Sequence, residues 1–146
     1  MTVADATTSV ASLAPRLRVA VTRLNRRLRS NALGGISPAQ ASALSMIDRL
    51  GSPALNTLAA AEQIRPPSMT RIVDALESDG LVERRVDETD RRSSRVSLTA
   101  AGRRELTTIR SRKTAFLEQR LAALSEDERV AVAAALDILE RLAEEQ

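Results

Sequence analysis

Two residue types that carry much of enzyme and metal chemistry are missing from this sequence of 146 residues, which contains neither cysteine nor histidine. Without cysteine there can be no disulfide, no thiolate metal site and no thiol-based redox sensor. Without histidine the chain has no imidazole general base, no Ser-His-Asp triad and no imidazole ligand for zinc. Carboxylates alone could bind a hard cation, but no pair of acids lies in an apolar setting that would tune one of them. We therefore expect neither an enzyme nor a protein that depends on a cofactor.

Aromatic residues and long apolar runs are also scarce. Phe116 is the only aromatic residue, and the apolar 43% of the chain is mostly Ala, Leu and Val. With 28% charged residues, this composition is typical of a globular, helix-rich protein. No apolar run approaches the roughly 18 residues that a membrane span needs, and residues 1–18 do not resemble a secretory signal. The length suits a single domain, which we expect in the cytoplasm with no membrane partner.

The positive charge comes almost entirely from arginine, since Lys113 is the only lysine and the net charge is +3. A composition rich in Ala and Arg mainly reflects a GC-rich genome, so the positions of the arginines are more informative than their number. No acid lies between Asp5 and Asp48, while six arginines fall in the first apolar-periodic segment. They either attract DNA or an anionic ligand, or form a solvated helix face whose ionic partners lie on other elements. The six are Arg16, Arg18, Arg23, Arg26, Arg27 and Arg29.

The segment 66–79 is predicted to be a helix with one apolar face. Pro66 and Pro67 suit a first turn, where backbone N–H groups have no helical partner. Gly80 suits the left-handed position just beyond the end of a helix. Apolar residues recur between these limits at the i, i+3, i+4, i+7 spacing of a buried helix face. They are Met69, Ile72, Val73 and Leu76.

Directly after this helix the pattern changes to that of a β-hairpin. Leu81 and Val82 begin a strand, a long polar tip follows, and Val96 and Leu98 alternate with polar residues in a returning strand. A helix followed at once by a charged hairpin is typical of a winged helix, in which the helix enters a DNA groove and the hairpin lies along the backbone.

The remaining segments are predicted to be helices with recognisable ends. A long first helix contains Pro15, which marks either its start or a kink. Capping boxes that begin at Ser37 and Ser125 start a second and a last helix. Residues 55–64 form a short third helix, and Thr99 is expected to cap a long helix after the hairpin.

Two motifs in the central stretch are specific enough to indicate a family. Residues 68–84 read S-x-T-R-I-V-D-x-L-E-x-x-G-L-V-x-R, and residues 90–102 read D-R-R-x-x-x-V-x-L-T-x-x-G. Together with the length and the order of elements, they resemble the MarR family of bacterial transcription regulators over nearly the whole chain. The resemblance implies a mainly α fold with a small β-hairpin, a winged helix-turn-helix with long terminal dimerisation helices.

The resemblance also implies how the chain is divided. Within a single domain of residues 1–146, residues 34–98 would form the DNA-binding lobe, and residues 8–33 and 99–146 would form the dimerisation helices. The long first and last helices have apolar faces that one small domain would not obviously cover, and a two-fold interface with a second copy would bury them. The alternative is a monomeric bundle in which the terminal helices pack on each other.

Residues expected to contact DNA lie in the first turn of the 66–79 helix and in the hairpin. Arg71 matches the family motif and could bind a guanine or a phosphate, while the hydroxyl residues could also be ordinary first-turn residues. By resemblance, tip arginines enter the minor groove, and Asp90 holds a nearby arginine, although it also suits a turn. The expected DNA-binding residues are Arg65, Ser68, Thr70, Arg71, Asp90, Arg91, Arg92 and Arg95.

Control of DNA binding is less visible in the sequence. Members of the resembled family commonly release DNA when a small aromatic or anionic molecule enters a crevice between the dimer helices and the DNA-binding lobe. No motif marks such a crevice, and a place in the core or a charge on the surface explains each candidate residue more readily than ligand binding does. The candidates are Arg16, Met46, Arg112 and Phe116.

The leading hypothesis is therefore a dimeric repressor that binds pseudo-palindromic operators in double-stranded DNA. A small-molecule effector would release it from the operator, and it would act at the bacterial nucleoid. A second hypothesis is a low-specificity architectural DNA-binding protein, or an activator that displaces other factors. A third is a winged-helix module that binds protein and no nucleic acid. The arginine-rich hairpin tip argues against the third, because such a module gains nothing from that placement.

Overall fold

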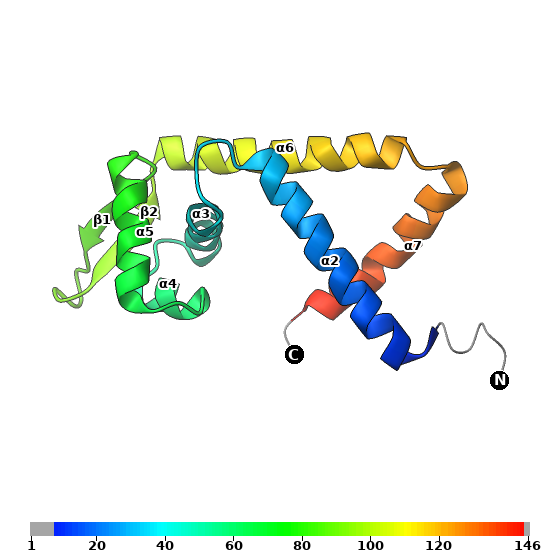
Figure 1. Ribbon diagram of the computed structural model, residues 1–146. Helices are drawn as coiled ribbons and strands as arrows, with labels where there is room; N and C mark the ends of the chain where they lie inside the picture. The colour runs from blue at the N-terminus through cyan, green and yellow to red at the C-terminus, as the bar shows by residue number, and fades with distance from the viewer. Residues whose placement is uncertain (1–7, 145–146) are drawn as a thin grey trace.

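The computed structural model describes residues 8–144 of the chain, as a mainly helical molecule with one antiparallel hairpin (Figure 1). Residues 1–7 and 145–146, which the predicted domain included, lie outside the described residues. The described elements are α2 (Val10–Ala32), α3 (Pro38–Leu50), α4 (Leu55–Ala61), α5 (Pro66–Ser78), β1 (Val82–Val86), β2 (Ser94–Leu98), α6 (Ala100–Ala122) and α7 (Glu126–Ala143). This arrangement confirms the predicted fold class.

Figure 1 shows a compact group of short elements, α3, α4, α5, β1 and β2, which we call the reading lobe. From the lobe α6 runs across the molecule as one long helix, and α7 folds back from its far end. α2 packs against α6 and leads into the lobe through the turn before α3. No helix within residues 8–144 is long and apolar enough to cross a membrane.

Local hydrogen bonds explain where most of the helices begin. Ser37 and Ser125 form the two predicted capping boxes, with Gln40 and Glu128 as the residues that reach back to the first backbone N–H. The Thr99 side chain accepts from the N–H of Gly102 at the start of α6. These three predicted starts are confirmed. They could be predicted from the sequence because each depends on residues only three positions apart.

One helix boundary differs from the sequence-based expectation, and one open alternative is decided. α2 begins at Val10, after an N-cap at Ser9, and continues through Pro15, so Pro15 does not mark its start. α4 ends at Ala61 instead of residue 64, because Gln63 adopts a left-handed φ of 54°. No glycine marks that turn, so the sequence carried no clear stop signal there.

The hairpin and its neighbours are held by backbone hydrogen bonds. β1 pairs antiparallel with β2 in a register that places Val82 opposite Leu98 and Arg84 opposite Val96. The N–H of Val96 also donates to the carbonyl of Pro53 at 2.9 Å, so β2 is attached to the segment between α3 and α4. We call β1, β2 and the connecting residues 87–93 the wing.

The core of the reading lobe is built from the predicted apolar face of α5. Met69, Val73 and Leu76 are fully buried, and Ile72 packs against them at the edge of the cluster. Gly80 has a φ of 72°, and the N–H of Leu81 returns to the carbonyl of Leu76 at 2.9 Å, which ends α5 as predicted. The same core includes buried residues from the other lobe elements, namely Leu44, Ile47, Leu58, Val82 and Val96.

The long helices are much less covered than the lobe. α7 has no buried residue among those described, and apolar side chains along both α2 and α7 lie open to solvent. Such an extended apolar surface is unusual for a soluble monomer. The large exposed side chains on these two helices include Leu13, Leu17, Val21, Leu24, Val132, Leu136, Leu139 and Leu142.

Candidate nucleic-acid interface

The first turn of α5 points several polar side chains away from the core. Because Met69 and Val73 face inward, Arg65, Ser68 and Arg71 are left exposed to solvent. Thr70 is half-buried, and its hydroxyl donates to the carbonyl of Pro66 at 3.0 Å, one turn earlier. Its oxygen can still accept a hydrogen bond, but its only proton is already donated within the helix. Thr70 therefore offers less to a ligand than its neighbours do.

The tip of the wing presents two exposed arginines, Arg91 and Arg92. Asp90 holds the turn beneath them, since its carboxylate accepts the N–H of Arg92 at 3.0 Å and its carbonyl accepts the N–H of Ser93 at 2.9 Å. Asp90 therefore takes the turn-forming role, which was one of its two expected roles. Within residues 8–144 Asp90 forms no ion pair, and the carboxylate that pairs with Arg95, close to the tip, belongs to a different aspartate.

That aspartate is Asp87, which is buried at the base of the wing tip. One carboxylate oxygen accepts from the hydroxyl and the N–H of Thr89, at 2.7 and 2.9 Å, and the other accepts from Nε of Arg95 at 2.8 Å. Hydrogen bonds from Thr89 lower the pKa of Asp87 to about 2, so the carboxylate is ionised. Asp87 was missed in the sequence, although an aspartate two residues before a threonine is a recognisable turn pattern.

Arg84 is a second residue that sequence reasoning left unassigned. It lies on the core-facing side of β1 and forms an ion pair with Asp74 on α5, while its Nε lies 3.6 Å from a carboxylate oxygen of Glu77. Arg84 thus joins the wing to α5 and offsets two acids of that helix. Its neighbour Arg85 points to the opposite face and pairs with Glu83 at 2.9 Å.

The four residues expected at an effector crevice have separate surroundings. Met46 packs against the lobe core, and Arg112 donates to the carbonyl of Ala32 at 3.4 Å. Phe116 is half-buried farther along α6, with the guanidinium of Arg120 5.2 Å from its ring centre. Arg16 lines a shallow cavity formed by α2 residues alone. The structure of one chain therefore gives these four no common cavity among those described.

A more suitable cavity lies where α2, α3 and α6 meet, and none of its residues was among the four effector candidates, although Arg29 was one of the six arginines considered for an anionic ligand. Its volume is about 320 Å³, and its lining combines apolar Leu33 and Ile109 with basic and polar side chains. Arg110 in this lining is paired with Asp48 at 2.9 Å, whereas Arg29 and Lys113 have no ion pair within residues 8–144. Only the packing of three separate helices brings these residues together.

The helix-turn-helix of α4 and α5, followed by a hairpin with exposed arginines at its tip, defines a DNA-binding protein of the winged-helix class. A sequence profile of the MarR family matches residues 36–94, which span α3 to the start of β2. The chain belongs to the MarR family of transcriptional regulators, and it is a DNA-binding regulator and not an enzyme.

Similar proteins extend this match over nearly the whole chain. An HTH-type transcriptional regulator of Mycobacterium bovis is 36% identical over 138 residues, which cover 94% of this chain and 96% of that protein. A crystal structure of a transcriptional regulator protein from Pseudomonas aeruginosa has a TM-score of 0.83 and 38% identity, and the alignment covers 96% of this chain and 100% of that one. The HTH-type transcriptional repressor MdtR of Bacillus subtilis is 29% identical over 94 residues, which cover 64% of this chain and 61% of MdtR.

Proposed function

We propose that this protein is a homodimeric repressor that binds pseudo-palindromic operators and is released by a small aromatic or anionic ligand. The observation that carries the proposal is that polar side chains at the start of α5 and at the wing tip are both exposed to solvent, while the core of the reading lobe holds α5 and the wing in place. In this proposal Arg65, Ser68 and Arg71 face a major groove, and Arg91 and Arg92 enter an adjacent minor groove. The repressor role is supported by the name of the similar Bacillus subtilis protein.

The proposed dimer would use residues 8–33 and 99–146, while residues 34–98 read DNA. Apolar side chains such as Leu136 and Leu139, which are 49% and 39% exposed, would be buried against a second copy. A two-fold axis then brings the same surface of both subunits together. It also presents two α5 helices about one DNA turn apart, which is why the operator should be a pseudo-palindrome.

The charges of the two helices also favour association between copies. α2 carries six arginines and no acid, whereas α7 carries five acids and two arginines. In residues 8–144 the α2 arginines have no ion pair within the chain. Opposite charges on α2 of one copy and α7 of the other would attract, and this attraction would favour a particular orientation of the two subunits.

For the effector, the cavity between α2, α3 and α6 is the best candidate site. Its volume of about 320 Å³ lies near the lower end for small-molecule sites. Arg29 and Lys113 would pair with an anionic group, and Leu33 and Ile109 would contact an apolar ring. A ligand there could bias the position of the lobe relative to the long helices, and so shift the population of DNA-competent dimers.

The test of the DNA-binding proposal is selection of duplexes from random-sequence DNA by the full-length protein at about 0.15 M salt. We expect an inverted repeat whose half-sites are centred roughly 10–10.5 base pairs apart. The selected duplex should bind at least about 10³-fold more tightly than a shuffled duplex at the same salt concentration. Equal binding of both duplexes would instead support the architectural protein, and no binding to either would support the protein-interaction module.

The ligand proposal can be tested separately with benzoate, which combines an aromatic ring with a carboxylate. Calorimetric titration should detect binding that weakens in the Arg29→Ala, Lys113→Ala double variant and persists in Arg16→Ala. Benzoate should also lower the affinity for the selected duplex in the unaltered protein. Equal benzoate binding by the double variant would exclude this cavity as its site.

A further inference from the structure

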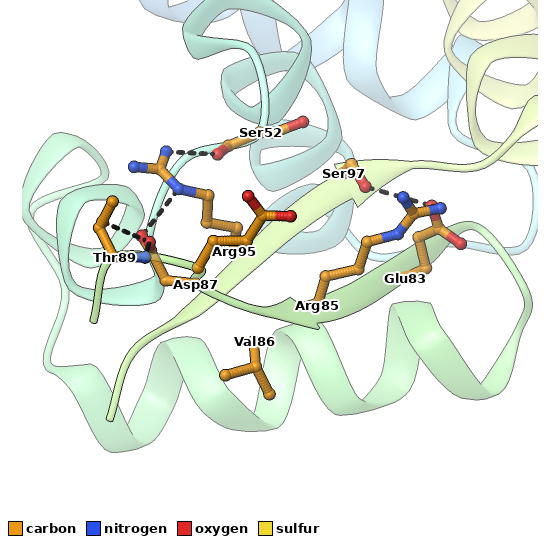
Figure 2. A pocket seen from close by; sticks show the side chains of 9 residues that line it. Ser52, Glu83, Arg85, Val86, Asp87, Thr89, Arg95 and Ser97 are labelled. Carbon is orange, nitrogen blue, oxygen red and sulfur yellow. Dashed lines mark hydrogen bonds and ion pairs between the residues drawn. The ribbon is translucent and has the colours of Figure 1, made fainter. Parts of the chain in front are cut away.

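The outer face of the wing carries a polar network that the proposed DNA contacts do not use (Figure 2). Arg95 extends from β2 between two acceptors, donating from Nε to Asp87 at 2.8 Å and from Nη1 to the carbonyl of Ser52 at 3.1 Å. Ser52 lies in the turn after α3, 43 positions earlier in the chain, and has a left-handed φ of 50°. We call these three residues and their two hydrogen bonds the wing link.

The wing link acts where the wing is attached to the lobe. Next to Arg95, the N–H of Val96 donates to Pro53, and Ala54 forms an isolated bridge with Arg95. These backbone bonds hold β2, but they do not reach the loop that carries the tip. Asp87 begins that loop, and its N–H also donates to the carbonyl of Ser93 at 3.0 Å, so the carboxylate of Asp87 lies where the tip leaves the strands.

The surroundings of Arg95 do not favour a phosphate. Its charge is matched by a buried carboxylate, and it lines a cavity of about 420 Å³ that also contains the acids Glu83 and Glu88. Arg85 in the same lining is already paired with Glu83, so acids outnumber arginines there. A phosphate placed there would be repelled by these acids and would compete with Asp87 for the guanidinium. In contrast, Arg91 and Arg92 have no ion pair within the described residues, so their guanidinium groups are available at the tip.

We propose that Arg95 is a positioning residue: by joining Asp87 to the Ser52 carbonyl, it holds the wing at the angle from which Arg91 and Arg92 reach DNA. This inference rests on the proposed DNA binding and replaces the expectation that Arg95 itself binds DNA. Lost preorganisation weakens binding because the tip must then be ordered when the complex forms.

The direction in which one substitution changes the DNA affinity distinguishes a positioning role of Arg95 from a direct contact with DNA. Asp87→Asn keeps an oxygen that can accept from Thr89, but it removes the charge that holds Arg95. If Arg95 contacted phosphate, removing this nearby negative charge would tighten DNA binding. If Arg95 positions the wing, binding of the selected duplex should weaken roughly 10-fold, which is the effect expected for the loss of one hydrogen bond to a charged group.

Glu88→Gln is the matched control, because it removes a neighbouring acid of the same cavity that forms no hydrogen bond or ion pair in residues 8–144. Its affinity for the selected duplex should be unchanged or slightly higher. Tighter binding by Asp87→Asn, equal to that of Glu88→Gln, would overturn the proposal.

A double-mutant cycle provides the second test. Arg95→Ala should weaken binding in the unaltered protein, yet change it by less than about twofold in an Arg91→Ala, Arg92→Ala background, where no tip contact is left to position. A direct contact would lower affinity by the same factor in both backgrounds. A general loss of folded protein would do the same, so equal factors overturn the proposal in either case.

The unfolding free energy and the molecular mass in solution should be measured for every variant, so that affinities are compared only among folded proteins. If the unaltered protein selects no duplex, the proposed function fails. If it selects a duplex but the cycle is additive, only the assignment of Arg95 fails.

Discussion

At the scale of single residues, the acids near the candidate interface are largely matched by arginines. Arg84 pairs with Asp74 and Glu77, Arg85 pairs with Glu83, and Arg95 pairs with Asp87. Seven acids lie among the arginines of residues 65–95, so this stretch is not uniformly basic in sequence. Pairing within the fold leaves a smaller set of arginines without an ion pair in the described part of the chain. They are Arg65, Arg71, Arg91 and Arg92.

Replacing Arg71 with alanine tests this set most directly. We expect the Arg71→Ala protein to remain folded, because the side chain is exposed, and to lose about 1–3 kcal/mol of binding free energy for the selected duplex. The measurement is a fluorescence anisotropy titration at fixed salt. Arg85→Ala serves as a control, because that arginine is paired with Glu83 and lies on the face of the wing that points away from the core. Equal losses in both variants would show that charge, and not position, determines the effect.

The lowered pKa of Asp87 predicts how the stability of the protein depends on pH. Its pKa falls from 3.8 to about 2 on folding, because the side chain and the backbone of Thr89 donate to it. A folded pKa below the unfolded value adds stability above the unfolded pKa, and this contribution is lost as the pH falls through about 2. Denaturant unfolding between pH 5 and pH 2 should therefore show a smaller decrease in unfolding free energy for Asp87→Asn than for the unaltered protein.

Thr89→Ala gives an intermediate case for the same measurement. It removes the hydroxyl donor but keeps the backbone N–H, so it should reduce the pH dependence without abolishing it. A Thr89→Ala curve identical to that of the unaltered protein would mean that the hydroxyl does not lower the pKa of Asp87.

At the scale of elements, the start of α6 depends on an unusually close approach to the turn between α5 and β1. A Cβ built on Gly102 would lie 1.9 Å from the carbonyl oxygen of Leu81. The same carbonyl accepts the N–H of Thr99 at 3.1 Å, so the backbone is fixed at this point. Only glycine allows α6 to leave the wing at this distance.

Gly102→Ala should accordingly destabilise the protein by about 1–3 kcal/mol, since the backbone must move to relieve the overlap. Gly35→Ala is the control, because a Cβ there would meet nothing within 4 Å and Gly35 does not have a positive φ. Its effect on the unfolding free energy should stay within about 1 kcal/mol. Thermal and denaturant unfolding of both variants would measure the difference, and equal stability of the two would contradict the close approach.

At the scale of the whole molecule, the exposed apolar faces of α2 and α7 determine the expected assembly. Placing charges on the α7 face with Leu136→Asp and Leu139→Asp should convert the proposed dimer into a monomer, because two carboxylates would be buried at the interface. Light scattering coupled to size-exclusion chromatography gives the mass. Duplex affinity should fall as well, since a monomer contacts only one half-site.

Leu50→Asp is a matched control for this experiment. Leu50 is 40% exposed, much as Leu139 is, but it lies at the end of α3 in the reading lobe. The Leu50 variant should keep the mass of the unaltered protein. If the double α7 variant also kept that mass, the interface would have to lie elsewhere.

The sequence alone determined the elements of this protein and its family, because the relevant signals are local. Capping boxes, the apolar spacing of α5 and the alternation of the strands each involve residues only a few positions apart, and the two motifs of residues 68–84 and 90–102 lie within continuous segments. The boundary that was wrong is the end of α4, where Gln63 adopts a left-handed φ without a glycine to mark it.

Only the tertiary structure decided how the charges are paired and where a cavity forms. Arg84 meets Asp74 through the packing of the wing on α5, and Arg95 meets Ser52 across 43 positions. The cavity beside Arg29 and Lys113 needs three helices that are far apart in the sequence. Composition indicated how many arginines this protein has, whereas the packing of distant segments determined which of them form no ion pair within residues 8–144.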